Sequence, residues 1–148
     1  MKLKIIPPVY FFSFLFLMIV FHFLFPVKMI IQAPYSYLGV LLILGGFSLT
    51  SWARELFRMK DLPVRPGEEL KDMVLSGPYC FSRNPMYLGM TLVLLGGSVG
   101  LGSLTSFLGP VAFFIVINLI FIPFEEQKLG STFGARYLAY KNKVRRWL

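Results

Sequence analysis

A cluster of polar side chains interrupts the hydrophobic sequence at SGPYCFSRNPMYLG, residues 76–89. Asn84 is a favourable helix N-cap, and the proline after it needs no N–H partner at the first helical position, so the segment can simply begin a helix. That role leaves Tyr79, Arg83 and Tyr87 unexplained. A helix N-terminus beside an arginine can bind a carboxylate or phosphate, and tyrosine rings can pack on a base or face a cation. The segment therefore predicts a ligand site at the start of a helix.

Two adjacent carboxylates, Glu125 and Glu126, follow the last long hydrophobic run, in the sequence FEEQKL. A solvated helix end is the simple interpretation. At a membrane edge, however, a carboxylate pair is costly to bury without partners, and it can accept hydrogen bonds from ribose hydroxyls or an amino group. No His or Cys lies near the pair in the sequence to complete a metal-ligand set. We therefore predict an organic ligand and no metal.

An amphipathic stripe follows the acidic pair. Its apolar members recur at spacings of four, four, three and four: Leu129, Phe133, Tyr137, Tyr140 and Val144. Basic residues flank the stripe, so a helix here can lie on an anionic membrane surface as an anchor or cover a site as a lid. Both roles stay open, and the pattern predicts a C-terminal amphipathic helix.

Four apolar runs must position these polar groups. Of the 148 residues 56% are hydrophobic and 15% charged, and a soluble domain of this size cannot bury four such runs at once. The predicted membrane spans are residues 9–25, 35–52, 86–101 and 107–124. The last two, joined by GSLTS, are expected to be antiparallel neighbours. We predict one all-α integral membrane domain, residues 1–148, with a central loop at 53–85 and a tail at 125–148.

The distribution of basic residues predicts the orientation. Two lysines precede the first span, six Lys and Arg lie in the central loop and six in the tail, whereas Lys28 alone lies on the opposite side. By the positive-inside tendency, both termini and the loop are expected to face the cytoplasm. All seven acidic residues fall on that side, so a site is expected where loop and tail meet. Because the basic residues follow the spans and no nucleic-acid motif is present, we predict membrane and lipid partners, not nucleic acid.

Two single residues have simple interpretations. Cys80 has no second cysteine for an internal disulfide and is expected to be a structural thiol. His22, inside the first predicted span, is a functional candidate in principle, but a lone histidine near a helix end is more often a hydrogen-bonded packing group.

Three motifs, in order, resemble the integral membrane family of isoprenylcysteine carboxyl methyltransferases and phospholipid methyltransferases. GPYCFSRNPMYLG is similar to GPY-x-x-x-R-H-P-x-Y-x-G, FEEQKL to E-E-x-x-L, and FGARYLAYKNKVRRW to F-G-x-x-Y-x-x-Y-x-x-x-V-x-R. The match covers roughly residues 60–147. Each motif alone is weak, but the ordered set around a helical hairpin is specific.

The resemblance implies S-adenosylmethionine as methyl donor, held where the loop, the start of the third span and the acidic pair meet. By position it implies that the following residues bind the cofactor: Lys71, Asp72, Met73, Val74, Gly77, Tyr79, Arg83, Asn84, Pro85, Met86, Tyr87, Glu125 and Glu126. Of these, Arg83, Glu125 and Glu126 are expected to take part in catalysis. Methyl transfer from a sulfonium depends mainly on positioning and loses charge, so a dry pocket at the membrane edge suits it.

The methyl acceptor stays open between two classes. The resemblance implies either an isoprenylcysteine-type carboxyl group or a phospholipid amine, and Asn84 in place of His is similar to the N-P-M-Y of phospholipid methyltransferases. Phe121 and Ile122 stand where carboxyl methyltransferases carry an arginine for the substrate carboxylate, although an arginine of the tail can fold back to replace it. In either case we expect a lipophilic acceptor that enters sideways from the inner leaflet.

Two other functions are alternatives. Membrane sterol reductases have a similar C-terminal half but use a nicotinamide cofactor, and the sequence contains no phosphate-binding cluster that favours them. A small membrane scaffold or transporter subunit would explain four spans but not three polar motifs on one side.

Overall fold

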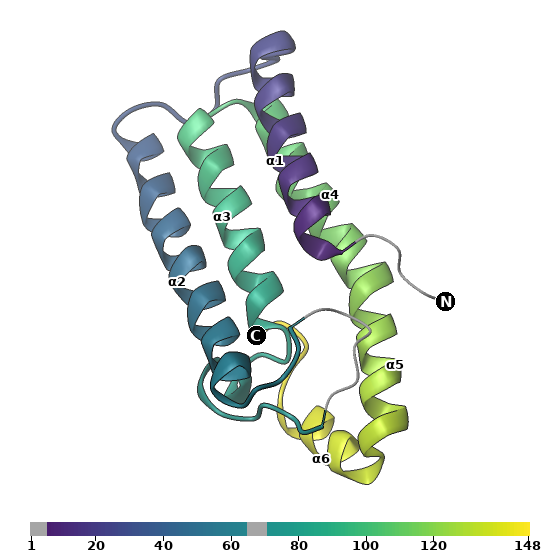
Figure 1. Ribbon diagram of the computed structural model, residues 1–148. Helices are drawn as coiled ribbons and strands as arrows, with labels where there is room; N and C mark the ends of the chain where they lie inside the picture. Colours follow the sequence, from purple (N-terminus) through teal and green to yellow (C-terminus); the bar gives the residue numbers. More distant parts are fainter. Residues whose placement is uncertain (1–5, 65–70) are drawn as a thin grey trace.

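The computed structural model describes residues 6–64 and 71–148, and within these ranges the regular elements are helices (Figure 1). In chain order they are α1 (Pro7–Leu24), η1 (Tyr35–Tyr37), α2 (Leu38–Met59), η2 (Gly77–Cys80), α3 (Pro85–Leu101), η3 (Leu104–Phe107), α4 (Leu108–Val116), the π-helical turn η4 (Ile117–Phe121), α5 (Ile122–Phe133) and α6 (Ala135–Lys143). The predicted all-α class is confirmed for the described residues. The long helices run side by side, and the site-bearing segments gather at one end of them (Figure 1).

Glycines bring α2 and α3 into close contact. A Cβ atom added to Gly46 would lie 2.5 Å from the carbonyl oxygen of Gly89, and one added to Gly96 would lie 2.6 Å from a carbonyl oxygen of α2. Thr50 donates a hydrogen bond to the carbonyl oxygen of Met86 at 3.3 Å. Small residues at such positions allow two helix backbones to approach within a membrane. The first turn of α3 is therefore held at a fixed place relative to α2.

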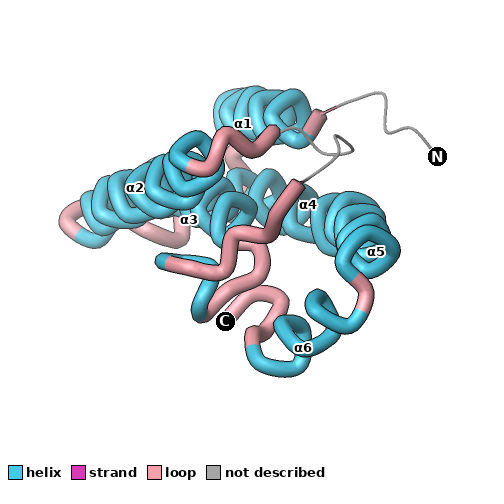
Figure 2. The backbone as a smooth tube through the Cα atoms, turned by 60° about the horizontal axis from the view of Figure 1, so that its bottom comes forward, coloured by secondary structure: helices cyan, strands magenta, loops and turns pink. Residues whose placement is uncertain are grey.

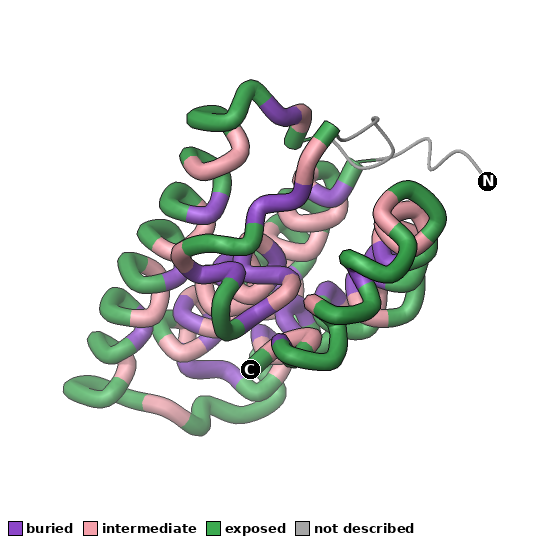
Figure 3. The backbone as a smooth tube through the Cα atoms, turned by 90° about the horizontal axis from the view of Figure 1, so that it is seen from below, coloured by how far each residue is buried: buried purple, intermediate pink, exposed green. Residues whose placement is uncertain are grey.

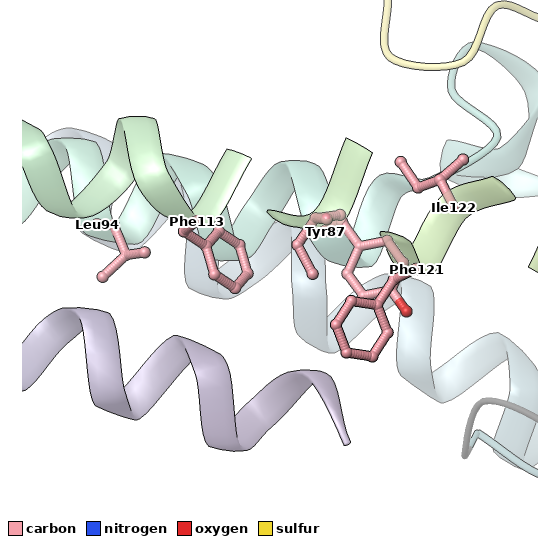
Figure 4. Close-up of a cluster of buried hydrophobic side chains, with 6 residues drawn as sticks. Tyr87, Leu94, Phe113, Phe121 and Ile122 are labelled. Atoms are coloured by element: carbon pink, nitrogen blue, oxygen red, sulfur yellow. The ribbon is translucent and has the colours of Figure 1, made fainter. Parts of the chain in front are cut away.

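A hydrophobic core joins α1, α3 and the long helix formed by α4, η4 and α5. Its buried members are Tyr87, Leu94, Phe113, Ile117, Phe121 and Ile122. Figure 4 shows Leu94, Phe113 and Phe121 following one another along the space between the helices. Tyr10 and Phe11 of α1 pack edge-on against this row, with ring centroids 5.3 Å from Phe121 and 6.0 Å from Phe113.

Serine hydroxyls and His22 join the helix ends opposite the site. Ser98 donates to the carbonyl oxygen of Ser106 at 2.8 Å, and Ser106 donates in turn to the carbonyl oxygen of Ser98 at 3.1 Å. His22 Nδ1 lies 2.9 Å from Ser103 Oγ. These bonds satisfy polar groups that would otherwise be costly to bury. His22 thus takes the hydrogen-bonded packing role.

Three of the helical segments are long and apolar enough to cross a membrane: Pro7–Leu24, Tyr35–Met59 and Leu104–Phe133. The 17-residue α3 is apolar but shorter. Large apolar side chains such as Phe12, Phe16 and Phe47 face outward, each more than 60% exposed. Such a surface requires a lipid environment, and the chain is an integral membrane protein.

The observed helices differ from the predicted spans at two ends. The second helix continues through Trp52 to Met59, so the predicted loop 53–85 begins as helix. The last long helix continues beyond residue 124 to Phe133. Hydropathy marks where the apolar residues stop, whereas a helix continues as long as its backbone hydrogen bonds do.

The predicted C-terminal amphipathic helix is present in two parts, because the helix breaks at Gly134. This residue has φ +51°, a value that favours glycine, and α6 begins directly after it. The stripe is divided between α5, α6 and the extended residue Val144, and α6 turns back beneath the helix ends (Figure 2).

Candidate functional site

The last residues of the chain fold back onto the start of α3. The Arg83 backbone N–H donates to the Arg145 carbonyl oxygen at 3.0 Å, and Asn84 Nδ2 donates to the Arg146 carbonyl oxygen at 2.9 Å. Asn84 is at the N-cap position as predicted, but its side chain makes no cap bond to α3. It holds the returning chain instead. Seen from this end of the molecule, the buried segments lie in the middle and exposed helix surfaces surround them (Figure 3).

The π-helical turn η4 receives the end of the returning chain. Pro123 has no N–H to donate to the Leu119 carbonyl oxygen, which fits the widening of the helix just before it. Asn118 lies in the widened turn, and its Oδ1 accepts hydrogen bonds from Trp147 Nε1 at 3.1 Å and from Arg146 Nη1 at 3.5 Å. These contacts tie α6 and the residues after it to the main helices.

Glu126 is the buried centre of an ion cluster whose outer members, Lys141 and Arg146, are partly exposed. Its side chain is 9% exposed and contacts Arg83 at 2.9 Å, Arg146 at 3.0 Å and Lys141 at 3.3 Å. A second contact from Arg146, its Nε at 3.3 Å, brings the contacts on the two carboxylate oxygens to four. A carboxylate offers about four lone-pair sites, so Glu126 is saturated by the protein itself.

Arg83 retains one unused donor. Its side chain is 9% exposed, and its guanidinium reaches Glu126 and the Lys141 carbonyl oxygen through Nη2 and Nη1. Its Nε is buried and has no hydrogen-bond partner within the described part of the chain. An unsatisfied buried donor costs about 1–3 kcal/mol, which an acceptor atom of a ligand would recover.

Glu125 has a different environment from its neighbour. The Tyr87 hydroxyl donates to Glu125 Oε1 at 2.6 Å, a short, charge-assisted bond that joins α3 to α5. Among the described residues no cation is paired with Glu125. The two adjacent carboxylates therefore separate into a saturated one and one with acceptor capacity.

Three tyrosines line the polar side. The Tyr140 hydroxyl donates to the Tyr79 carbonyl oxygen at 2.8 Å, and the Tyr79 ring lies 5.6 Å from the Phe57 ring. Burial raises the pKa of Tyr79 and Tyr140, and that of Tyr137 to about 12. These phenols therefore stay neutral near pH 7 and present hydrogen-bond donors and aromatic faces without adding negative charge.

A cavity of about 410 Å³ lies between these groups. This volume falls in the range typical of small-molecule sites. One part of the wall is polar and aromatic: Tyr79, Arg83, Asn84, Tyr87, Glu125, Glu126, Tyr137 and Tyr140. Another part is apolar and comes largely from the starts and ends of the long helices: Ile6, Pro7, Pro8, Phe57, Pro63, Val64, Met90, Leu129 and Phe133. Met73, Val74, Pro85, Met86 and four further polar residues (Thr50, Arg54, Lys128 and Thr132) complete the lining.

Ten of the thirteen predicted cofactor residues line this cavity, and Lys71, Asp72 and Gly77 do not. Lys71 is exposed. Asp72 pairs with Lys60 at 3.1 Å and Arg136 at 2.9 Å, which hold the loop against α6. Gly77 has φ +61° and packs on Trp52. Asp72 and Gly77 thus shape the loop that carries the neighbouring cavity residues.

The contribution of α2 was missed by the sequence analysis. Thr50, Arg54 and Phe57 of this helix line the cavity, although the predicted span ended at Trp52. Their spacings of four and three place them on one helical face. A search for polar residues along that face would have found Thr50 and Arg54. Phe121 and Ile122, which stand in place of the arginine that binds a substrate carboxylate, are fully buried in the core. Arg146 of the tail does fold back, but it is paired with Glu126.

The fold and site define an all-helical membrane protein with a ligand cavity at one end of its helices. The model of the phospholipid methyltransferase family matches residues 34–136. Since this range covers more than half of the chain, the protein belongs to that family of membrane methyltransferases, and the resemblance drawn from the three motifs is confirmed.

One relative extends the comparison. An uncharacterized protein of Haemophilus influenzae is 48% identical over 63 residues, which are 43% of this chain and the whole of that protein. No solved structure matches the chain.

Proposed function

We propose that the chain transfers a methyl group from S-adenosylmethionine to a lipophilic acceptor at the cytoplasmic edge of the membrane. The observation that carries the proposal is the cavity, whose polar, aromatic wall adjoins an apolar wall at the helix ends. A water-soluble cofactor needs the first surface, and the hydrocarbon part of a lipid needs the second. Membership of the phospholipid methyltransferase family supplies the reaction class.

The residues present fit the cofactor. The unpartnered Nε of Arg83 is suited to a carboxylate, and Tyr79, Tyr137 and Tyr140 offer faces for a base or a cation. Glu125 can accept from an amino group or from ribose hydroxyls. When bound, S-adenosylmethionine supplies an electrophilic methyl group on a sulfonium. We propose that nine of the ten cavity-lining members of the predicted set hold it, all except Glu126: Met73, Val74, Tyr79, Arg83, Asn84, Pro85, Met86, Tyr87 and Glu125.

We assign different roles to the protein's own groups. Tyr87 fixes one oxygen of Glu125 and so orients this carboxylate toward a ligand or toward an amine proton of an acceptor. Glu126 is a positioning residue, because its ion pairs are all made within the protein and hold Arg83 in place. The returning residues after α6 help to exclude water, which favours a reaction that disperses charge.

The proposed arrangement in the membrane has four spans, with α3 as the shortest, and both termini in the cytoplasm. Fourteen of the fifteen basic residues then lie on the side of the site. A helix of 17 residues is about 26 Å long and can cross with slight thinning of the bilayer. In this arrangement the site faces the cytoplasmic pool of cofactor.

The test is incubation of the purified protein with a lipid extract and methyl-labelled S-adenosylmethionine, followed by identification of the labelled product. We expect label in a lipophilic product, either an ester of an isoprenylcysteine-type acid or a methylated phospholipid amine. Label found solely in water-soluble products would refute a lipid acceptor. Binding of NADPH without binding of S-adenosylmethionine would refute the methyl donor.

A further inference from the structure

We propose that Arg54 binds an anionic group on an amphiphilic methyl acceptor, either the carboxylate that is methylated or a phosphate near a methylated amine. This inference rests on the proposed function and adds a residue that sets substrate specificity. It comes from the position of Arg54 in the cavity and from the pairing of the other cavity arginine, Arg83, with Glu126.

The backbone of Arg54 is held rigidly. It lies one helical turn after Thr50, whose side chain is bonded to the start of α3, and two turns after Gly46, which is packed on Gly89. Ala53 beside it is fully buried. A guanidinium on such a scaffold is positioned with little loss of backbone freedom on binding, which is what a recognition residue needs.

Arg54 differs in its partners from four other arginines of the described residues. Arg58 pairs with Glu55, Arg136 with Asp72, and both Arg83 and Arg146 with Glu126. Arg145, like Arg54, has no carboxylate partner within these residues, but it does not line the cavity. Within residues 6–64 and 71–148, no carboxylate is paired with Arg54, although it lines the cavity. An arginine presents a planar set of donors that matches the geometry of a carboxylate or phosphate.

The neighbouring walls indicate the rest of the ligand. Arg54 shares the cavity with Phe57 of its own helix, Met90 of α3 and the first residues of α1, Ile6 to Pro8. A cation beside an apolar surface suits a molecule whose charged head is attached to a hydrocarbon chain. The polar groups proposed to hold the cofactor lie in the same cavity, so such a head would be brought next to the donor.

A competing role for Arg54 is plain contact with lipid phosphates at the membrane surface, as for many basic residues at helix ends. The two roles make different predictions in a detergent that contains no phospholipid. There a surface contact has no partner, whereas a binding residue still affects the binding of an added ligand.

The experiment measures binding, not turnover, to purified protein in an uncharged detergent with S-adenosylhomocysteine present. Two zwitterionic probes that each carry an anionic group, farnesylcysteine and lysophosphatidylethanolamine, distinguish the carboxylate from the phosphate, and we call them the anionic probes. Farnesylcysteine amide and a monoacylglycerol are their counterparts without the anion. We expect Arg54→Gln to weaken the anionic probe that binds by about 10- to 100-fold, the loss of a charge-assisted hydrogen bond, and to leave its counterpart unchanged.

The matched control is Arg58→Gln, one turn farther along α2, where the side chain is 81% exposed and does not line the cavity. It should change neither probe. Arg54→Lys should restore part of the affinity, because the charge remains. Affinity for S-adenosylmethionine should be unaltered in all three variants.

Four results would overturn the inference. They are equal binding of the probes to wild type and Arg54→Gln, equal loss for the anionic probes and their counterparts, no binding of either anionic probe to wild type, or a loss confined to S-adenosylmethionine. The last would make Arg54 part of the donor site. The proposed function fails separately, if the wild-type protein binds no S-adenosylmethionine at all.

Discussion

The two sides of the cavity are built in different ways. On one side, α2 and α3 are joined by glycines that allow backbone to touch backbone, without any charge. On the other side, residues 134–148, which we call the C-terminal layer, are held by one buried carboxylate and three cations. Shape complementarity holds α2 against α3, and electrostatic attraction holds the C-terminal layer. The comparison teaches that a small membrane protein can fix one side of a site by packing two helix backbones together and the other side by ion pairs.

Replacing Glu126 should give the largest effect. Glu126→Gln leaves Arg83, Arg146 and Lys141 facing one another around a neutral group, and breaking a buried pair in this way costs about 3–5 kcal/mol. We expect a lower thermal unfolding midpoint and faster proteolysis of the C-terminal layer. The control Glu55→Gln removes an exposed pair of 3.6 Å to Arg58 and should cost at most about 1 kcal/mol. Equal effects of the two changes would show that the cluster does not hold the layer.

The glycine contact should give the next largest effect. In Gly89→Ala the new Cβ would lie 2.5 Å from the Gly46 carbonyl oxygen and would also clash with Thr50, so α2 and α3 must separate. Such overpacking costs about 1–3 kcal/mol, which unfolding in detergent would measure. Gly45→Ala is the matched control, because nothing lies within 4 Å of its Cβ position. A similar loss in both variants would contradict the idea that this side depends on close packing.

The Tyr87–Glu125 bond joins α3 to α5 between the two sides and should give the smallest effect on stability but a clear one on binding. Tyr87→Phe removes the 2.6 Å hydrogen bond while keeping the ring in the core. We expect affinity for S-adenosylmethionine, measured by calorimetry, to fall about tenfold, since Glu125 loses the donor that orients it. Tyr37→Phe, at an exposed position of η1, is the control and should bind normally. Unchanged affinity in Tyr87→Phe would remove Glu125 from the proposed site.

Much of the site was predictable because its parts are short motifs. Arg83, Asn84 and Tyr87 stand within five residues of one another, and Glu125 and Glu126 are adjacent, so local geometry already keeps each set together. Their ordered match to one family then indicated that the sets meet. The structure places both sets on one cavity.

The different roles of Glu125 and Glu126 were not predictable. Neighbouring residues on a helix point about 100° apart, and which of the two meets Arg83 and which meets Tyr87 depends on how α5 is rotated against α3. The same holds for Arg54, which becomes a cavity residue only because α2 continues beyond the predicted span and packs on α3 through glycines.

The sequence by itself determined the membrane environment, the helical class and the family, because composition, hydropathy and short motifs are local properties of the chain. Tertiary structure alone decided that the tail returns to Asn118, that Glu126 is saturated by its own protein, and that Arg54 faces the cavity. Each of these depends on contacts between residues far apart in the chain. Such contacts are selected by the packing of whole helices, which no single stretch of sequence encodes.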